Sequence, residues 1–208
     1  MNALEIRATV GLALIYALRM VGMFMILPVF ALYAHGLPVP ATDFQIGLAI
    51  GIYGLVQATL QIPLGMASDR FGRKPIIVIG MLLFALGSFV AGASDDLLWI
   101  TFGRAVQGLG AVSSAVSALL ADLTRDSVRT TAMAILGAGM GLAFICALVA
   151  GPVVAGVIGV TGIFHITGLL ALFAIPVVLW LVPAAPQPHA SNAGVMTVLR
   201  DPQLLRLD

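Results

Sequence analysis

The sequence contains six apolar runs, each about as long as a helix that crosses a membrane. A hydrocarbon core about 30 Å thick takes about 20 residues of α-helix, and the runs fall at roughly 9–34, 44–67, 75–94, 97–121, 131–156 and 162–182. Hydrophobic residues make up 61% of the chain and charged residues only 9%, against about half and about a quarter in soluble domains. The sequence therefore predicts an all-α membrane protein with six transmembrane helices.

Basic residues flank the predicted helices on one side of the membrane only. Every second connection, and both ends of the chain, contain lysine or arginine: Arg7, Arg70, Arg73, Lys74, Arg125, Arg129, Arg200 and Arg206. The alternate connections contain neither residue. Because cytoplasmic loops are enriched in lysine and arginine, we predict a multi-pass protein of a bacterial-type inner (plasma) membrane with both termini in the cytoplasm.

The composition changes after the sixth run. We predict a six-helix bundle over residues 1–182, a Pro-rich cytoplasmic linker over 183–193, and an amphipathic surface helix over 194–208. Within the bundle, Arg19 and Arg104 each precede a glycine in the first and fourth runs, and Pro63 and Pro152 lie near the ends of the second and fifth. This internal similarity indicates two inverted three-helix repeats, a plan found in many transporters.

The stretch from Gly65 to Lys74 places four charges within six residues, between two predicted membrane helices. Asp69 falls at a helix C-terminus, as does Asp122, and Arg73 falls at a helix N-terminus. Each position opposes the helix dipole at a cost of about 0.3–1 kcal/mol. A bridge from Arg73 to both aspartates would relieve all three charges, so we predict a charge cluster at the cytoplasmic face. The simpler interpretation is a loop that only anchors the topology.

Arg19 and Arg104 lie inside predicted membrane helices, with no acidic residue at a comparable depth. Charge at such a position is costly and usually marks a polar cavity, although Arg104 is also near enough to an interface to reach it. A few polar groups among apolar and methionine side chains suit an amphipathic organic substrate. The candidate cavity residues are Tyr16, Arg19, Met23, Tyr53, Gln57, Gln61, Gln107, Ser114 and Ser117. Binding of an anionic solute by Arg19 is an open alternative.

An enzyme is disfavoured by the sequence. The visible pairing of a nucleophile with a base, Ser113 or Ser114 with His165, has no positioned carboxylate. We expect no cofactor, no metal site and no nucleic-acid partner, and the single cysteine, Cys146, lies in an apolar run. A channel or a non-transporting membrane scaffold remains the alternative to a transporter.

The sequence as a whole, including residues 19–24 and 120–125, resembles the YajR-like drug:proton antiporters of the major facilitator superfamily. Four stretches, spread over the chain, also resemble the signature motifs of this superfamily. Gly65-x-x-x-Asp69-Arg70-x-Gly72-Arg73-Lys74 resembles the loop between helices two and three, and Arg104-x-x-Gln107-Gly108 resembles the RxxQG motif of helix four. Gly151-Pro152 with Gly156 resembles the antiporter motif of helix five, with Ala147 and Ala155 replacing two of its glycines. Gly22 and Pro28-Val29 resemble the first-helix motif without its final proline.

The resemblance implies the N-terminal six-helix half of a proton-coupled efflux antiporter, whose partners are a small-molecule substrate, protons, the lipid bilayer and a second six-helix half. It implies a gating latch made of Gly65, Asp69, Arg70, Gly72, Arg73, Lys74 and Asp122, proton coupling at Arg104, Gln107 and Gly108, and antiporter-specific packing at Gly151, Pro152 and Gly156. In the family, the position of Asp69 also faces a helix N-terminus of the second half. Since this chain contains only six runs, we expect a fragment that does not transport by itself.

Overall fold

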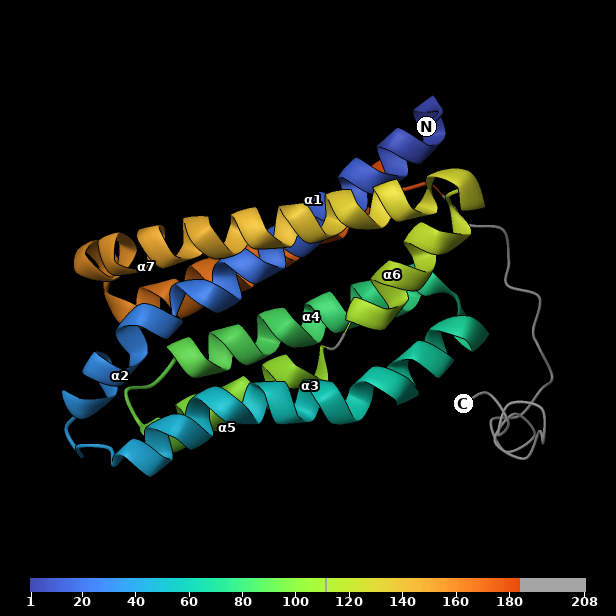
Figure 1. The fold of residues 1–208 in the computed structure, drawn as a ribbon. Coiled ribbons are helices and arrows are strands. Elements are labelled where there is room, and N and C mark those ends of the chain that lie inside the picture. Colours follow the sequence, from blue (N-terminus) through green and yellow to red (C-terminus); the bar gives the residue numbers. More distant parts are fainter. Residues whose placement is uncertain (111, 184–208) are drawn as a thin grey trace, which may run out of the picture.

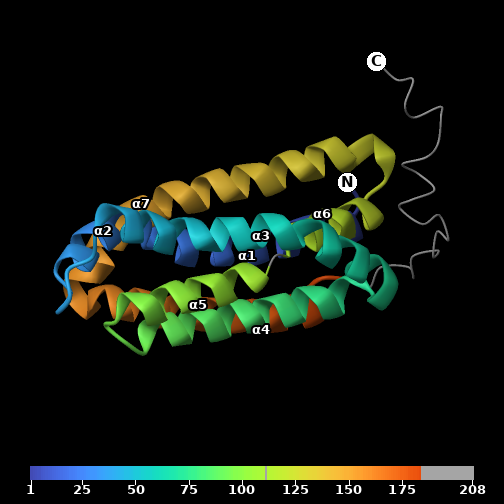
Figure 2. The ribbon, with the colours of Figure 1, turned by 90° about the horizontal axis from the view of Figure 1, so that it is seen from below.

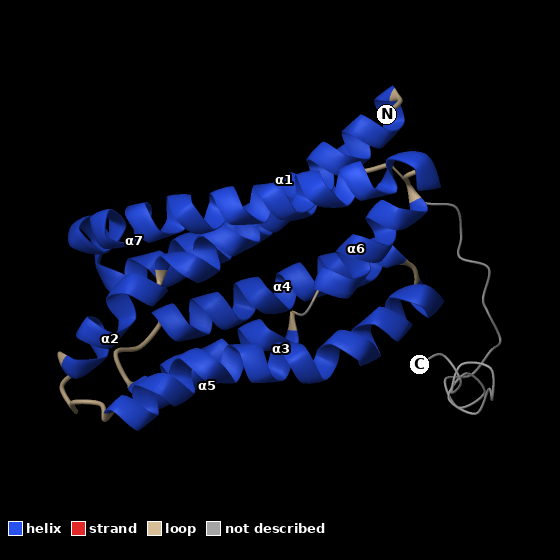
Figure 3. Cartoon of the chain, in the orientation of Figure 1, coloured by secondary structure: helices blue, strands red, loops and turns tan. Residues whose placement is uncertain are grey.

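The computed structural model describes residues 1–110 and 112–183, and every regular element among these residues is a helix (Figure 3). In order they are α1 (Ala3–Met25), α2 (Leu27–His35), α3 (Asp43–Phe71), α4 (Arg73–Gly92), α5 (Leu97–Leu109), α6 (Ser113–Asp122), α7 (Asp126–Pro176) and the π-helix η1 (Val177–Leu181). The predicted surface helix over 194–208 lies outside the described residues, as does the predicted linker over 183–193 apart from Pro183. The prediction of an all-α protein is confirmed for the described part.

The helices lie side by side in one elongated bundle (Figures 1 and 2). Among the described residues, five stretches are long and apolar enough to cross a membrane: Ala3–His35, Asp43–Phe71, Arg73–Gly92, Leu97–Asp122 and Asp126–Leu181. The last stretch contains Gly159, whose φ of 73° and ψ of 174° are not helical. Figure 1 shows the chain of α7 turning back on itself, so that the helix has two arms. Gly159 lies within the connection predicted between the fifth and sixth runs.

Two of the runs predicted as continuous helices are interrupted, and this corrects the sequence analysis. The first run divides into α1 and α2 at Ile26, because Pro28 has no N–H and its ring clashes with the carbonyl group four residues earlier. The fourth run divides into α5 and α6 after Leu109. There the backbone approaches α4 closely: a Cβ atom added to Gly110 would lie 2.4 Å from the carbonyl oxygen of Gly80. A periodic pattern of apolar residues does not reveal such breaks.

The charged stretch predicted as a hairpin is reduced to one residue. Helix α3 continues through Phe71 and α4 begins at Arg73, so Gly72 alone makes the turn. Its φ of 95° lies in the left-handed region, which favours glycine because it has no Cβ atom. The turn therefore fixes the last turn of α3 directly against the first turn of α4.

Close approach between helix backbones holds α4 against α5. A Cβ atom added to Gly87 would lie 2.4 Å from the backbone nitrogen of Gln107, and one added to Gly103 would lie 2.5 Å from that of Ala91. In a membrane, where lipid is as apolar as a side chain, such contacts between small residues drive helix association. These two glycines therefore set the spacing of α4 and α5.

We predict opposite effects of two glycine-to-alanine substitutions. Gly87→Ala should lower the melting temperature, because overpacking of a close contact costs about 1–3 kcal/mol. Gly47→Ala on α3 should be neutral or stabilising, since an added Cβ atom meets nothing within 4 Å there and alanine favours the helix by about 0.5–1 kcal/mol. Thermal unfolding of the purified protein in detergent measures both, and equal melting temperatures would contradict the packing argument.

Candidate functional site: a charge cluster and two buried arginines

The helix ends that carry basic residues gather at one end of the bundle, which we call the basic end. The N-termini of α1, α4 and α7 and the C-termini of α3, α6 and η1 all lie there (Figure 1). The opposite end contains the connections over 36–42 and 93–96 and the turn of α7 at Gly159. The alternation of basic and non-basic connections in the sequence thus corresponds to two different ends of the folded bundle.

At the basic end, Arg73 contacts two carboxylates that belong to different helices. Its Nη1 forms an ion pair with Asp69 in the last turn of α3, and its Nε donates to Oδ2 of Asp122 at the end of α6 over 3.1 Å. Its Nη1 also donates to Oγ of Ser68 over 2.7 Å. The Arg73 side chain is 12% exposed. The bridge expected from the opposed helix dipoles is therefore present, and it ties together three helix ends.

The remaining residues of the expected latch do not join this ion-paired cluster. Arg70 is exposed and stacks on the ring of Phe71, 5.5 Å from its centroid. Lys74 instead donates to the carbonyl oxygen of Val182, just after η1. Gly65 packs against α6, where an added Cβ atom would lie 3.4 Å from Oγ of Ser114. Of the charged residues predicted for the latch, the structure brings together Asp69, Arg73 and Asp122 only.

Arg19 lies in the middle of the bundle and is 1% exposed. Its Nη2 donates to the hydroxyl group of Tyr53 over 2.9 Å, to Oε1 of Gln57 over 3.0 Å and to the carbonyl oxygen of Gly110 over 3.1 Å. Its Nε and Nη1 are buried and have no hydrogen-bond partner among the described residues. The guanidinium carbon lies 5.0 Å from the centroid of the Phe84 ring. The bundle thus supplies acceptors for one of the three nitrogens of this cation.

Arg104 forms a second buried cationic site beside the first. It is 3% exposed, and it donates to Oε1 of Gln107 over 3.0 Å and to the carbonyl oxygen of Ile50 over 3.4 Å. Gln107 in turn donates to Oγ of Ser88 over 2.7 Å. The guanidinium carbon of Arg104 lies 4.9 Å from the centroid of the Tyr53 ring. In this structure, Arg104 is therefore buried in a polar network and does not reach an interface.

The other candidate cavity residues have different surroundings. Tyr16 is buried in the main apolar core, and Met23 packs at its edge. Ser114 donates to the carbonyl oxygen of Gln61 over 3.1 Å, which links α6 to α3, and Ser117 is half-buried. The structure therefore brings Arg19, Tyr53 and Gln57 into direct contact, whereas Gln107 belongs to the network of Arg104, and Tyr16, Met23 and Ser114 pack between helices.

The glycines of the two remaining motifs differ in how closely they are packed. A Cβ atom added to Gly108 would lie 2.7 Å from the carbonyl oxygen of Tyr53. One added to Gly151 would lie 2.4 Å from the carbonyl oxygen of Met25. At Gly156 it would meet nothing within 4 Å, and Pro152 is exposed. Gly108 and Gly151 are therefore sites of helix contact within the described bundle, whereas Pro152 and Gly156 face outward from it.

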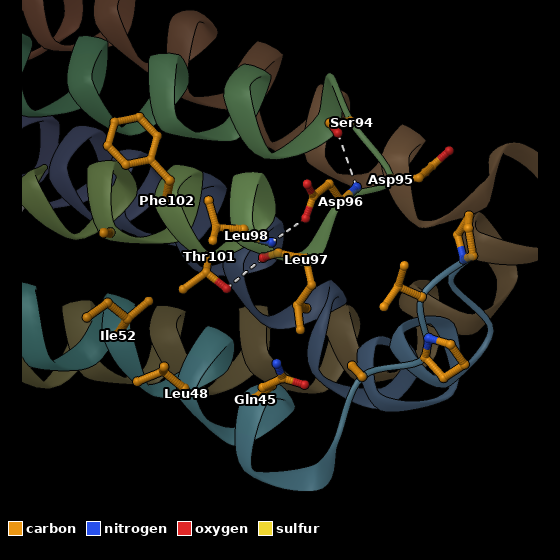
Figure 4. Close-up of a pocket in the computed structure, with 15 residues that line it drawn as sticks. Gln45, Leu48, Ile52, Ser94, Asp95, Asp96, Leu97, Leu98, Thr101 and Phe102 are labelled. Carbon is orange, nitrogen blue, oxygen red and sulfur yellow. Dashed lines mark hydrogen bonds between the residues drawn. The ribbon is translucent and has the colours of Figure 1, made fainter.

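A pocket of about 900 Å³ opens between α3 and α5 near the end opposite the basic end (Figure 4). Figure 4 shows Leu48 and Ile52 of α3 across from Thr101 and Phe102 of α5. The side chain of Asp96 accepts a hydrogen bond from the backbone N–H of Leu98 over 2.8 Å and caps α5 at the rim. None of the predicted cavity residues lines this pocket, which is mostly apolar and separate from the buried arginines.

Sequence reasoning missed an ion pair between distant residues at the basic end. Glu5 is 1% exposed and accepts hydrogen bonds from Nε and Nη2 of Arg125, over 2.8 and 3.2 Å. This pairing raises the pKa of the Arg125 guanidinium further above its usual range. The pattern Asn2-x-x-Glu5, which forms a capping box at the start of α1, was the available signal for an ordered Glu5. Nothing in the sequence, however, pairs Glu5 with a residue 120 positions away.

The residues considered for an enzyme are not brought together as an acid–base pair. Nδ1 of His165 contacts the carbonyl oxygen of Thr161 over 2.8 Å, and the Ser114 hydroxyl group donates a hydrogen bond to the carbonyl oxygen of Gln61. Among residues 1–110 and 112–183, no group of three or more His, Cys, Asp or Glu side chains is placed to hold a metal ion. The chemistry that the described residues offer is instead that of buried cations, polar acceptors and ion-paired helix ends.

These features define a multi-pass membrane protein with two cations buried in its interior. The family model of the Major Facilitator Superfamily matches residues 12–206, and the chain belongs to this superfamily. It is 46% identical over 211 residues to the inner membrane transport protein YajR of Escherichia coli (strain K12), covering 98% of this chain and 46% of that protein. It is 32% identical over 114 residues to the class B tetracycline resistance protein of Escherichia coli, covering 54% of this chain and 27% of that protein.

The fold agrees with this assignment. A bacterial homologue of the human lysosomal transporter Spinster, solved in an inward-facing and occupied conformation, superimposes with a TM-score of 0.80 at 19% identity. The match covers 92% of this chain and 47% of that one. The chain thus spans about half the length of the curated relatives that it matches over most of its own length.

For the Glu5–Arg125 pair we predict an asymmetric response to mutation. Arg125→Gln should lower the melting temperature more than Glu5→Gln does, because it leaves a buried carboxylate without its cation. Glu5→Gln leaves only Arg125, which is 64% exposed and can be solvated. Thermal unfolding of the two variants in the same detergent tests this, and a larger loss for Glu5→Gln would show that burial of Glu5 does not decide the effect.

Proposed function

We propose that the protein is a secondary active transporter, specifically a proton-coupled efflux antiporter for amphipathic organic compounds. The chain would cross the membrane six times as two inverted three-helix repeats, with the two arms of α7 as the fifth and sixth crossings. The basic end would face the cytoplasm, as the positive-inside rule requires. A second six-helix half, supplied by the rest of a longer protein or by another chain, would complete the transport path.

The contact of Arg73 with Asp69 and Asp122 is the observation that carries this proposal. It joins the ends of α3, α4 and α6 through charges that are each unfavourable at their own helix end. Such a contact is stable when all three members meet, and it weakens when one carboxylate is protonated or displaced. That behaviour suits a cytoplasmic latch that opens and closes during alternating access.

Two further features support proton-coupled antiport. Arg104, Gln107 and Ser88 form a buried polar network in the position of the RxxQG motif, where a family member would couple proton movement. Gly151 lets the first arm of α7 approach the junction of α1 and α2, as expected of the antiporter motif. The similarity to a tetracycline resistance protein is consistent with efflux of organic compounds.

Transport by the complete protein, as its gene encodes it, tests the proposal. The protein is reconstituted in proteoliposomes with an imposed proton gradient, and the probes are ethidium, a permanent cation, and 1-anilinonaphthalene-8-sulfonate, a permanent anion. We expect accumulation of at least one probe against its gradient, abolished by a protonophore. Passive flux that ignores the protonophore would indicate a channel, and no flux of either probe would favour a membrane scaffold.

Variants of the charge cluster give the matching prediction. Arg73→Ala and Asp122→Ala should each abolish transport or folding. Arg73→Ala leaves Asp69 and Asp122 without their cation at unfavourable helix ends, and Asp122→Ala removes the ion pair that joins α4 to α6. Asp69→Asn should insert normally but disturb gating, measured as altered exchange rates in the same proteoliposomes. Asp126→Ala is the control, since this carboxylate is 91% exposed and its ion-pair partner among the described residues is Arg129, one turn away on the same helix. Wild-type transport by all three cluster variants would contradict the latch and indicate that the charges only anchor the topology of the loop.

A further inference from the structure

We propose that Arg19 binds the anionic group of the transported solute, so that the substrates are amphipathic organic anions, with carboxylates as the simplest case. This inference rests on the proposed transport function and narrows it to one class of substrate. It assigns a ligand to a buried guanidinium group that has two nitrogens without a hydrogen-bond partner among the described residues.

The hydrogen bonds of Arg19 are the first argument. A guanidinium group carries five N–H bonds, three of them on Nε and Nη1. Both of these nitrogens are buried and without a partner among the described residues, whereas Nη2 alone contacts three acceptors. Buried polar groups are almost always hydrogen-bonded in folded proteins. Three unpaired N–H bonds on one cation therefore indicate a ligand with strong acceptor atoms.

The distribution of charge is the second argument. Within the described residues, the acidic side chains lie at or next to helix ends: Glu5, Asp43, Asp69, Asp95, Asp96, Asp122 and Asp126. The buried cations Arg19 and Arg104 both lie near the ring of Tyr53, with their guanidinium carbons 5.9 and 4.9 Å from its centroid. Their hydrogen-bond acceptors are neutral hydroxyl, amide and carbonyl groups. Two like charges in an apolar interior produce a positive potential that attracts an anion.

The surroundings of Arg19 indicate the rest of the ligand. The rings of Phe84 and Tyr53 lie beside the guanidinium group, and Met23 packs against the same apolar cluster. Aromatic and methionine side chains accept varied apolar groups with little specificity. A small inorganic anion would leave these surfaces unused, so the site suits an anion attached to an aromatic or aliphatic body.

Access to Arg19 depends on α3. Its partners Tyr53 and Gln57 both belong to this helix, which has the smallest buried share of the five candidate membrane spans. If α3 shifted, the hydroxyl group of Tyr53 and the amide oxygen of Gln57 could be replaced by the acceptor atoms of a bound anion. The main apolar core would stay covered. Because the last turn of α3 supplies Asp69, release of the charge cluster at the basic end would remove one of the contacts that hold this helix over Arg19.

Equilibrium binding tests this inference without a proton gradient. The probes are 2-naphthoate, 2-naphthamide and trimethyl(2-naphthyl)ammonium, which share one ring system and differ in charge. Dialysis against the complete purified protein in detergent, with empty micelles as the blank, should show 2-naphthoate binding at least tenfold more tightly than the other two. Arg19→Gln should weaken 2-naphthoate about ten- to a hundredfold and leave 2-naphthamide unchanged, as expected for loss of a charged hydrogen-bond partner.

Two additional variants keep the result interpretable. Arg19→Lys keeps the charge but loses the planar donor set, so it should retain part of the preference for 2-naphthoate even if Arg19→Gln does not fold. Arg7→Gln is the matched control, because Arg7 lies at the basic end and donates to the carbonyl oxygens of Trp180 and Leu181. This control should bind 2-naphthoate like the wild type.

Equal affinity of the wild type for all three probes would overturn the inference, as would a preference for 2-naphthoate that persists in Arg19→Gln. If the wild type shows no preference and Arg19→Gln lowers the melting temperature, Arg19 stabilises the bundle through its hydrogen bonds to Tyr53, Gln57 and Gly110 and binds no solute anion. Arg19-dependent binding without protonophore-sensitive transport would support the site but refute the proposed coupling. Gradient-driven transport of ethidium, unaffected by Arg19→Gln, would support the coupling but refute the site.

Discussion

Hydrocarbon offers no hydrogen-bond partner to a buried polar group, and the whole bundle is arranged around that constraint. The backbone N–H and carbonyl groups form hydrogen bonds with each other within the helices, and nearly all charges of the described residues lie at helix ends. Arg19 and Arg104 are the exceptions, and their hydrogen-bond acceptors are hydroxyl, amide and carbonyl oxygens of α3, of α5 and of the break after α5. The cost of burying these two cations is the reason to expect that they do something beyond holding helices together.

The charges at the basic end show that a charge that is unfavourable at its own helix end becomes favourable when it is ion-paired. Asp69 and Asp122 lie at helix C-termini and Arg73 at a helix N-terminus, so each opposes its own helix dipole. Their mutual contact offsets these costs and ties α3, α4 and α6 together. Glu5 and Arg125 likewise tie the start of α1 to the connection before α7. The basic end is therefore held by ion pairs between elements far apart in the chain.

Helix α3 connects the two proposed sites. Its last turn supplies Asp69 to the charge cluster, and its middle supplies Tyr53 and Gln57 to Arg19. Much of the remaining surface of α3 is exposed in the described bundle, and glycines such as Gly51 and Gly54 meet nothing there. Polar contacts at these two points, together with the close packing of Gly108 against Tyr53, hold α3 in the bundle. Exchange of the polar contacts suits an element that moves between transport states.

The sequence by itself determined the helical class, the connections that contain the turns at Gly72 and Gly159, and the bridge from Arg73 to two carboxylates. These features follow from hydropathy, glycine conformation and helix dipoles, which act within one helix or at its end. The breaks at Ile26 and Gly110, by contrast, were not visible in the apolar pattern.

The tertiary structure alone decided which groups satisfy the buried charges. Glu5 pairs with Arg125 across 120 positions, and Arg19 meets acceptors from α3 and from the break after α5. The unpaired Nε and Nη1 of Arg19 became evident only once those partners were known. Sequence shows that a charge lies inside the membrane, but its hydrogen bonds depend on which helices pack beside it, and packing is set by contacts between residues distant in the chain.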